Sequence, residues 1–138
     1  MIILSVEYGD ARTGIAVCDP LGLLASPVTV LCTGSAADII NKTAALAKEK
    51  QAQLIIVGYP KNMDGSEGFR AQAVKEFADE LERTGGIPVK LWDERLTTVS
   101  AHKYLNEVNV RGKKRKQLVD AVSAVIILQS YLDSIKNQ

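Results

Sequence analysis

The sequence predicts an α/β protein with a mixed five-stranded sheet, three antiparallel strands followed by two parallel ones, and helices on both faces. Two observations lead to this fold class. The chain opens with short β-branched runs separated by turn residues, and its later apolar runs alternate with segments of helical periodicity. Its 138 residues, 46% of them hydrophobic, suit one domain spanning residues 1–138.

The first third of the chain predicts the antiparallel strands. Residues 2–8 form an apolar run that Gly9-Asp10 ends, and residues 13–19 read as its hairpin partner before Pro20. Residues 24–32 supply a third strand, with Pro27 at an edge or at its start.

The remaining chain predicts alternating helices and strands. Ser35 caps a helix whose apolar residues, from Ile39 to Ala47, recur at about 3.6-residue spacing. Residues 54–57 form a buried strand, residues 67–83 a second helix that Gly85-Gly86 stop, and residues 88–92 another strand. Thr97 or Thr98 would cap a short helix through residue 105, and residues 117–134 form the last helix.

Acidic residues follow or approach the ends of the parallel strands, where ligands bind in open α/β sheets. Glu7 ends the first strand, Asp93 and Glu94 end the fifth, and Asp120 lies in the last helix. Carboxylates from different elements that meet at one edge can hold Mg²⁺ and support in-line phosphodiester hydrolysis. The pattern predicts a metal-dependent phosphodiesterase without a protein nucleophile.

Each of these acids also has a purely structural interpretation. Glu7 could simply mark the end of a strand, although a carboxylate in a buried layer is costly unless it is paired or bound to metal. One of Asp93 and Glu94 could form an ion pair with Arg95, and Asp120 could be exposed. The small residues that follow Asp120 favour a helix that approaches the sheet closely.

Positive charge is concentrated rather than general. The net charge is +1, yet Arg111-Gly112-Lys113-Lys114-Arg115-Lys116 carries five positive charges in six residues, which indicates a basic surface for nucleic acid or a solvated helix start. Lys61 and Asn62, after the fourth strand, could bind phosphate or sugar, or belong to an ordinary loop.

The composition excludes several classes of protein. A single histidine, His102, excludes a histidine-based triad, and two distant cysteines suit reduced thiols rather than a zinc site. The apolar runs are too short to span a membrane and the N-terminus lacks a basic leader, so we expect a cytoplasmic protein.

Four blocks, in order over nearly the whole chain, carry a resemblance to a known family. They are residues 6–9 with Arg12 and 14–19, residues 57–65, residues 92–98, and residues 113–116 with 120–124 and 128–132. In these blocks the chain resembles the YqgF/RuvX family. The resemblance implies a ribonuclease H-like fold and a nuclease that processes the 5′ end of pre-16S ribosomal RNA, or a Holliday junction resolvase.

The resemblance also implies roles for single residues. Glu7, Glu94 (or its neighbour Asp93) and Asp120 would form an acidic triad for Mg²⁺ or Mn²⁺. The nucleic-acid backbone, in precursor rRNA or branched DNA, would meet Arg12, Lys61, Arg95, Arg111, Lys113, Lys114, Arg115 and Lys116. A homodimer is possible, because junction resolvases act as dimers.

One position departs from the family pattern. The family normally has aspartate where this chain has Glu7, whose extra methylene adds roughly 1.5 Å of reach. An offset of that size can lower a rate about 10²-fold. A nucleic-acid-binding module with weakened catalysis therefore stays open. An acidic strand end followed by a glycine turn and a hairpin also begins ATPases of the actin and sugar-kinase type, but those close two such domains around a nucleotide and this chain has room for only one.

Overall fold

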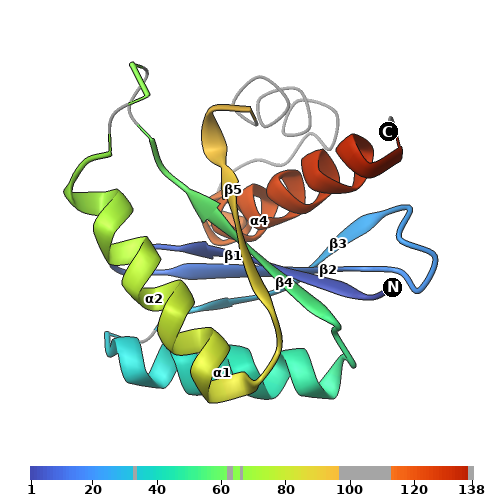
Figure 1. The fold of residues 1–138 in the computed structure, drawn as a ribbon, viewed down its shortest axis with the longest axis horizontal. Helices are drawn as coiled ribbons and strands as arrows, with labels where there is room; N and C mark the ends of the chain where they lie inside the picture. The colour runs from blue at the N-terminus through green and yellow to red at the C-terminus, as the bar shows by residue number, and fades with distance from the viewer. Residues whose placement is uncertain (33, 62–63, 66, 97–112, 137–138) are drawn as a thin grey trace.

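The computed structural model describes residues 1–32, 34–61, 64–65, 67–96 and 113–136, with only the backbone described for 96 and 113–120. These residues form one five-stranded sheet and its covering helices (Figure 1). The elements are β1 (Ile3–Tyr8), β2 (Thr13–Cys18), β3 (Ala25–Leu31), α1 (Ala36–Glu49), β4 (Leu54–Tyr59), α2 (Phe69–Gly85), β5 (Val89–Asp93), the 3₁₀ turn η1 (Glu94–Leu96) and α4 (Lys113–Lys136).

The strands lie in the order β3-β2-β1-β4-β5. β1 pairs antiparallel with β2, and β2 with β3, whereas β1 pairs parallel with β4, and β4 with β5. The predicted fold class is thus confirmed, including the change from antiparallel to parallel pairing. Because β1, β4 and β5 run parallel, their carboxyl ends lie at the same edge of the sheet.

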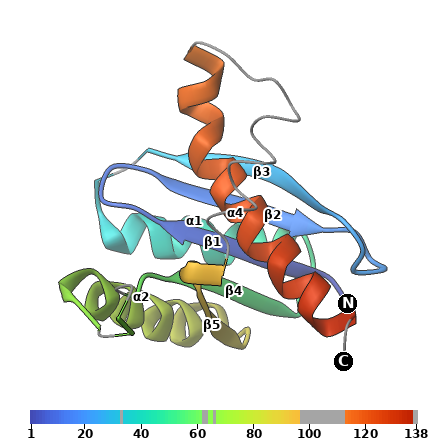
Figure 2. The ribbon, with the colours of Figure 1, turned by 90° about the horizontal axis from the view of Figure 1, so that it is seen from above.

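The two faces of the sheet are covered by different helices. α1 and α2 lie on one face and α4 crosses the other (Figure 2). Alternate residues of β1 divide between the two cores, with Leu4 and Val6 packing among residues of α1 and α2, and Ile3 packing among residues of α4. This alternation places Ser5 and Glu7 on the face that α4 covers.

A buried hydroxyl attaches α4 to the central strand. Ser5 is fully buried, and its Oγ donates a hydrogen bond of 2.6 Å to the carbonyl oxygen of Ala124. Gln129 attaches the same helix to the β2–β3 connection by accepting from the amide of Ala25 and donating to the carbonyl of Leu23. These bonds set the position of α4 along the sheet, in addition to apolar packing.

Removal of the Ser5 hydroxyl is expected to destabilise the fold. We expect Ser5→Ala to lower the free energy of unfolding by about 1 kcal/mol, the net value of a typical hydrogen bond. Ser26→Ala, at an exposed position of β3, is the control and should leave stability unchanged. Urea denaturation of both variants measures the difference, and equal stabilities would contradict a structural role for the Ser5 bond.

The predicted element boundaries are largely confirmed. Ser35 caps α1 by accepting from the amide of Asp38, and Gly86, at φ 68°, ends α2 in the left-handed conformation. α2 begins at Phe69 rather than at residue 67. The short helix predicted between residues 97 and 105 lies outside the described residues.

The last helix begins four residues earlier than predicted, at Lys113 instead of residue 117. The four basic residues before residue 117 thus belong to the helix, although basic side chains at a first turn oppose the helix dipole. α4 is 24 residues long, but neither it nor another described helix is apolar enough over a sufficient length to cross a membrane.

Candidate active site

Two carboxylates from different elements meet above a glycine at the carboxyl edge of the sheet. Glu7 comes from β1, Glu94 from the start of η1, and Gly58 from β4, which lies between β1 and β5. A Cβ on Gly58 would stand 2.8 Å from Oε2 of Glu7 and 3.0 Å from Oε1 of Glu94. The two oxygens are therefore separated by no more than the sum of these distances.

The same point is closed from above by α4. Cδ1 of Ile127 would lie 2.6 Å from a Gly58 Cβ, closer than real Cβ atoms approach a neighbour. Oε2 of Glu7 is buried. Only a residue without a side chain lets the two carboxylates and the helix come this close to β4.

The neighbouring Asp93 has a different environment. Its carboxylate accepts hydrogen bonds from Nη2 of Arg95 at 2.6 Å and from the backbone amide of Arg95 at 3.0 Å. The side-chain hydrogen bond from Arg95 holds the pKa of Asp93 below its usual value. Of the two acids that the sequence left as alternatives, Asp93 thus forms the ion pair and Glu94 lies beside Glu7.

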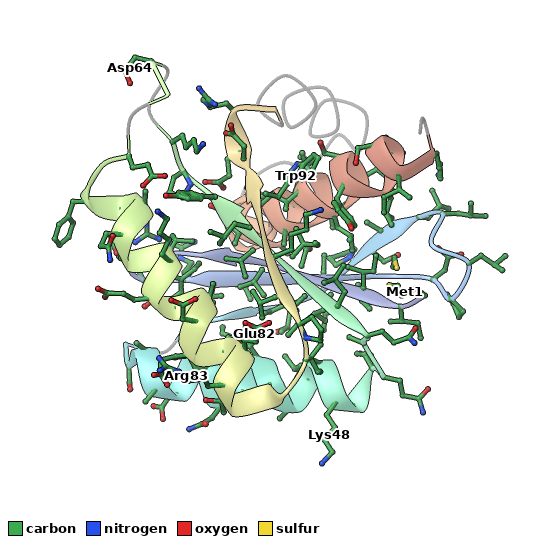
Figure 3. All side chains as sticks on the ribbon, in the orientation of Figure 1. Met1, Lys48, Asp64, Glu82, Arg83 and Trp92 are labelled. Atoms are coloured by element: carbon green, nitrogen blue, oxygen red, sulfur yellow. The ribbon has the colours of Figure 1, made fainter. Side chains whose placement is uncertain are left out.

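Trp92 anchors the end of β5 that carries these acids. Its Nε1 donates to Oγ of Ser130 at 3.3 Å, and its ring meets that of Tyr131 edge-on at 5.5 Å. In Figure 3 Trp92 lies between β5 and α4. The position of Glu94, two residues further on, is therefore tied to α4 as well as to the sheet.

The third predicted acid lies on α4. Asp120 is within the helix, four residues before Ala124 and seven before Ile127, the spacing of a single helix face. Its side chain lies outside the described residues. Among the side chains that are described, no group of three acidic, histidine or cysteine residues is arranged to hold a metal ion.

The described pair nevertheless suits a hard cation. Mg²⁺ and Mn²⁺ prefer carboxylate oxygens, and Mg²⁺ is usually held by one or two carboxylates together with water and substrate phosphate. Two carboxylates this close repel each other, and a divalent cation between them would offset that repulsion. Glu7 and Glu94 therefore fit the ion that the sequence implies.

The predicted nucleic-acid contacts are placed only in part. Arg12 is exposed in the β1–β2 turn, and Lys61 follows β4, with its Nζ 5.8 Å from the centre of the Tyr59 ring. Arg95 is bound to Asp93. Lys113, Lys114, Arg115 and Lys116 occupy the first turn of α4, but their side chains, and all of Asn62 and Arg111, lie outside the described residues.

Lys75 of α2, which the sequence did not single out, lies near Lys61. Its Nζ contacts Glu67 at 2.8 Å and lies 5.4 Å from the centre of the Tyr59 ring. The hydrogen bond between them lowers the pKa of Glu67 and raises that of Lys75. Lys75 is thus already paired with a carboxylate, which makes it a weaker candidate for binding phosphate than Lys61.

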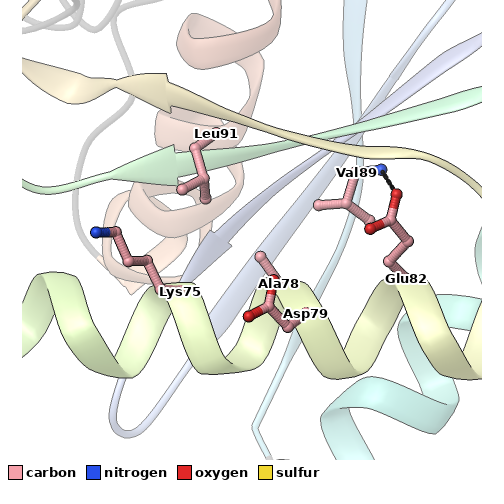
Figure 4. A pocket seen from close by; sticks show the side chains of 6 residues that line it. All are labelled: Lys75, Ala78, Asp79, Glu82, Val89 and Leu91. Atoms are coloured by element: carbon pink, nitrogen blue, oxygen red, sulfur yellow. Dashed lines mark hydrogen bonds between the residues drawn. The ribbon is translucent and has the colours of Figure 1, made fainter.

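Two hollows on the described surface are lined by residues other than the carboxylate pair. One of about 300 Å³ separates α2 from β5 and is lined by Lys75, Ala78, Asp79, Glu82, Val89 and Leu91 (Figure 4). There Oε1 of Glu82 accepts a hydrogen bond of 3.2 Å from the amide of Val89, which covers one donor of the edge strand. A structural role explains this arrangement.

A family model and named relatives match nearly the whole chain. The family model described as "RuvX: Holliday junction resolvase" matches residues 1–134. The chain belongs to the RuvX family. A relative from Clostridium novyi, named "Putative pre-16S rRNA nuclease", is 44% identical over 135 residues, which are 98% of this chain and 100% of the relative. One of the same name from Syntrophus aciditrophicus is 41% identical and covers 100% and 92% of the two chains.

Solved structures of resolvases share the fold of this RuvX family member. RuvC of T. thermophilus in complex with a Holliday junction substrate aligns with a TM-score of 0.66 at 12% identity, over 97% of this chain and 96% of that chain. The fowlpox virus resolvase bound to Holliday junction DNA aligns with a TM-score of 0.58 at 14% identity, over 98% and 99%. The ribonuclease H-like fold that the sequence implied is therefore confirmed.

Proposed function

We propose that this RuvX family member is a divalent-metal-dependent nuclease that hydrolyses phosphodiester bonds in structured nucleic acid, with the 5′ end of pre-16S rRNA as its substrate. The observation that carries the proposal is the convergence of Glu7 and Glu94 above Gly58 at the carboxyl edge of the sheet. Asp120, on the helix that covers this edge, completes the proposed ligand set.

The proposed roles follow from position. Glu7 and Glu94 would hold Mg²⁺ or Mn²⁺ through carboxylate oxygens, with Asp120 as a third ligand. An ion held there would supply activation of a water molecule and neutralisation of the charge that develops on the phosphate. Asp93 holds Arg95 in place, and Arg12, Lys61 and the basic first turn of α4 bind the nucleic-acid backbone.

The two candidate substrates have different support. Relatives 41–44% identical over nearly the full chain carry the name of a pre-16S rRNA nuclease, which favours ribosomal RNA precursors. The family description and the shared fold of RuvC favour branched DNA as the second candidate. Contacts to phosphate carry no information on base sequence, so the basic residues do not choose between these substrates.

The direct experiment incubates the purified protein with labelled precursor rRNA and with a four-way DNA junction, each with Mg²⁺, Mn²⁺ or EDTA. We expect metal-dependent cleavage near the 5′ end of the rRNA. Cleavage of the junction alone would favour a resolvase function. Binding of nucleic acid without cleavage would contradict the nuclease and favour the alternative of a nucleic-acid-binding module.

Glu7→Asp tests the departure from the family pattern. We expect this variant to raise the cleavage rate, by up to about 10²-fold, because the shorter side chain returns the carboxylate to the reach that the family normally uses. The measurement is the single-turnover rate with Mn²⁺. Glu7→Gln, the control, should abolish cleavage, whereas an inactive Glu7→Asp variant would show that this site is built around the longer acid.

A further inference from the structure

Arg70, in the first turn of α2, binds the turn between β1 and β2. Its Nη1 donates to Oδ1 of Asp10 at 2.6 Å, and its Nη2 donates to the backbone carbonyl of Tyr8. The guanidinium carbon lies 5.5 Å from the centre of the Tyr8 ring. One side chain of α2 therefore contacts the backbone, the ring and the following carboxylate of this segment.

The ring of Tyr8 is held by the same helix. It stacks on Phe77 with the ring centres 4.0 Å apart and the planes 11° apart. Tyr8 directly follows Glu7, and the two side chains point to opposite faces of the sheet. On the α2 face, the end of β1 is therefore held by the Arg70 hydrogen bond and the Phe77 ring. Glu7 lies on the α4 face, beside Glu94.

The carbonyl contact matters more than the ion pair. The Asp10 side chain is 95% exposed, and an ion pair with so exposed a carboxylate contributes little to stability. The hydrogen bond from the guanidinium to the carbonyl is charge-assisted and partly buried, and it acts on the backbone immediately after Glu7. The planar guanidinium reaches the carboxylate and the carbonyl through separate nitrogens, a geometry that a lysine ammonium does not reproduce.

From these contacts we propose that Arg70 is a positioning residue, which fixes the end of β1 so that the Glu7 carboxylate stays beside Glu94 above Gly58. This role rests on the proposed function, because it concerns the same pair of metal ligands. It assigns Arg70 to the support of the site and not to the phosphate-binding surface.

The experiment compares Arg70→Gln and Arg70→Lys with Arg83→Gln. Arg83 lies in the same helix and pairs with Glu80 on an exposed surface, so its replacement removes the same group without touching the β1–β2 turn. Three quantities are measured on the full chain: amide hydrogen exchange of residues 8–12 without metal, Mn²⁺ affinity by calorimetry, and the salt dependence of binding to labelled precursor rRNA.

For Arg70→Gln we expect faster exchange in residues 8–12 and an Mn²⁺ affinity about 10-fold lower, as for other residues that orient metal ligands. Arg70→Lys should fall between this variant and wild type, and Arg83→Gln should match wild type. The salt dependence of binding should be unchanged, because a positioning residue neutralises no phosphate.

Two results would overturn the positioning role while the proposed function stands. One is wild-type exchange and Mn²⁺ affinity in Arg70→Gln. The other is a weaker salt dependence with unchanged exchange, which would make Arg70 a phosphate contact. If the wild-type protein neither binds Mn²⁺ nor cleaves, the proposed function fails and the positioning role fails with it.

Discussion

Glu94→Gln is expected to lower the rate of metal-dependent cleavage by about 10²- to 10³-fold, the loss typical of removing one electrostatic group from an active site. Glu94 provides one of the two carboxylates that meet above Gly58, and glutamine keeps its size while removing the charge. Single-turnover cleavage of labelled precursor rRNA with Mn²⁺ measures the loss. Affinity for RNA without metal should stay close to that of wild type.

Asp93→Asn is the matched control at the adjacent position. Asp93 pairs with Arg95, and both side chains are partly exposed. Such a pair contributes about 1 kcal/mol or less, so we expect a rate within about fivefold of wild type. If Asp93→Asn removed activity and Glu94→Gln did not, the metal ligand would have to be reassigned to Asp93.

Gly58→Ala is expected to lower cleavage by about 10²-fold, because shifts of about 1 Å in reacting groups have effects of this size. The new methyl group would stand 2.8 Å and 3.0 Å from the Glu7 and Glu94 oxygens and 2.6 Å from Ile127. At least one of these groups must move. Overpacking should also lower the free energy of unfolding by about 1–3 kcal/mol, which denaturation measures.

A double variant separates the two effects of Gly58→Ala. Ile127→Val removes the Cδ1 atom that the methyl group meets. The double variant Gly58→Ala/Ile127→Val should therefore be more stable than Gly58→Ala alone, while its cleavage rate stays low. Gly34→Ala, where a Cβ would meet nothing within 4 Å, should leave both quantities unchanged. Full recovery of cleavage in the double variant would show that the carboxylates tolerate the methyl group, contrary to this account.

The local sequence was sufficient to predict most elements of the fold. The run of residues 2–8, the cap at Ser35 and the glycine after α2 each follow from short-range rules, and the structure confirms all three. The start of α4 could not be predicted in this way. Four basic residues in its first turn oppose the helix dipole, and yet the helix begins at Lys113.

The residues of the candidate site also divide into those that the local sequence identified and those that it did not. Glu7, Asp93, Glu94 and Asp120 were identifiable as acids at strand ends or on the last helix, because the carboxyl edge of a parallel sheet collects such residues. The sequence did not single out Gly58 as a site residue, although an isolated glycine in a strand often marks a close approach. Arg70 gave no signal, since its contacts join residues about 60 positions apart in the chain.

The sequence alone determined the fold class, the acidic character of the sheet edge and the concentration of positive charge near the start of the last helix. These depend on periodicity, turn chemistry and residue type, which are local properties. Only the tertiary structure decided that Arg95 binds Asp93, that Glu94 meets Glu7, and that Gly58 makes room for both. Those outcomes depend on distances between separate elements, which are set when β1, β4, β5 and α4 pack against one another.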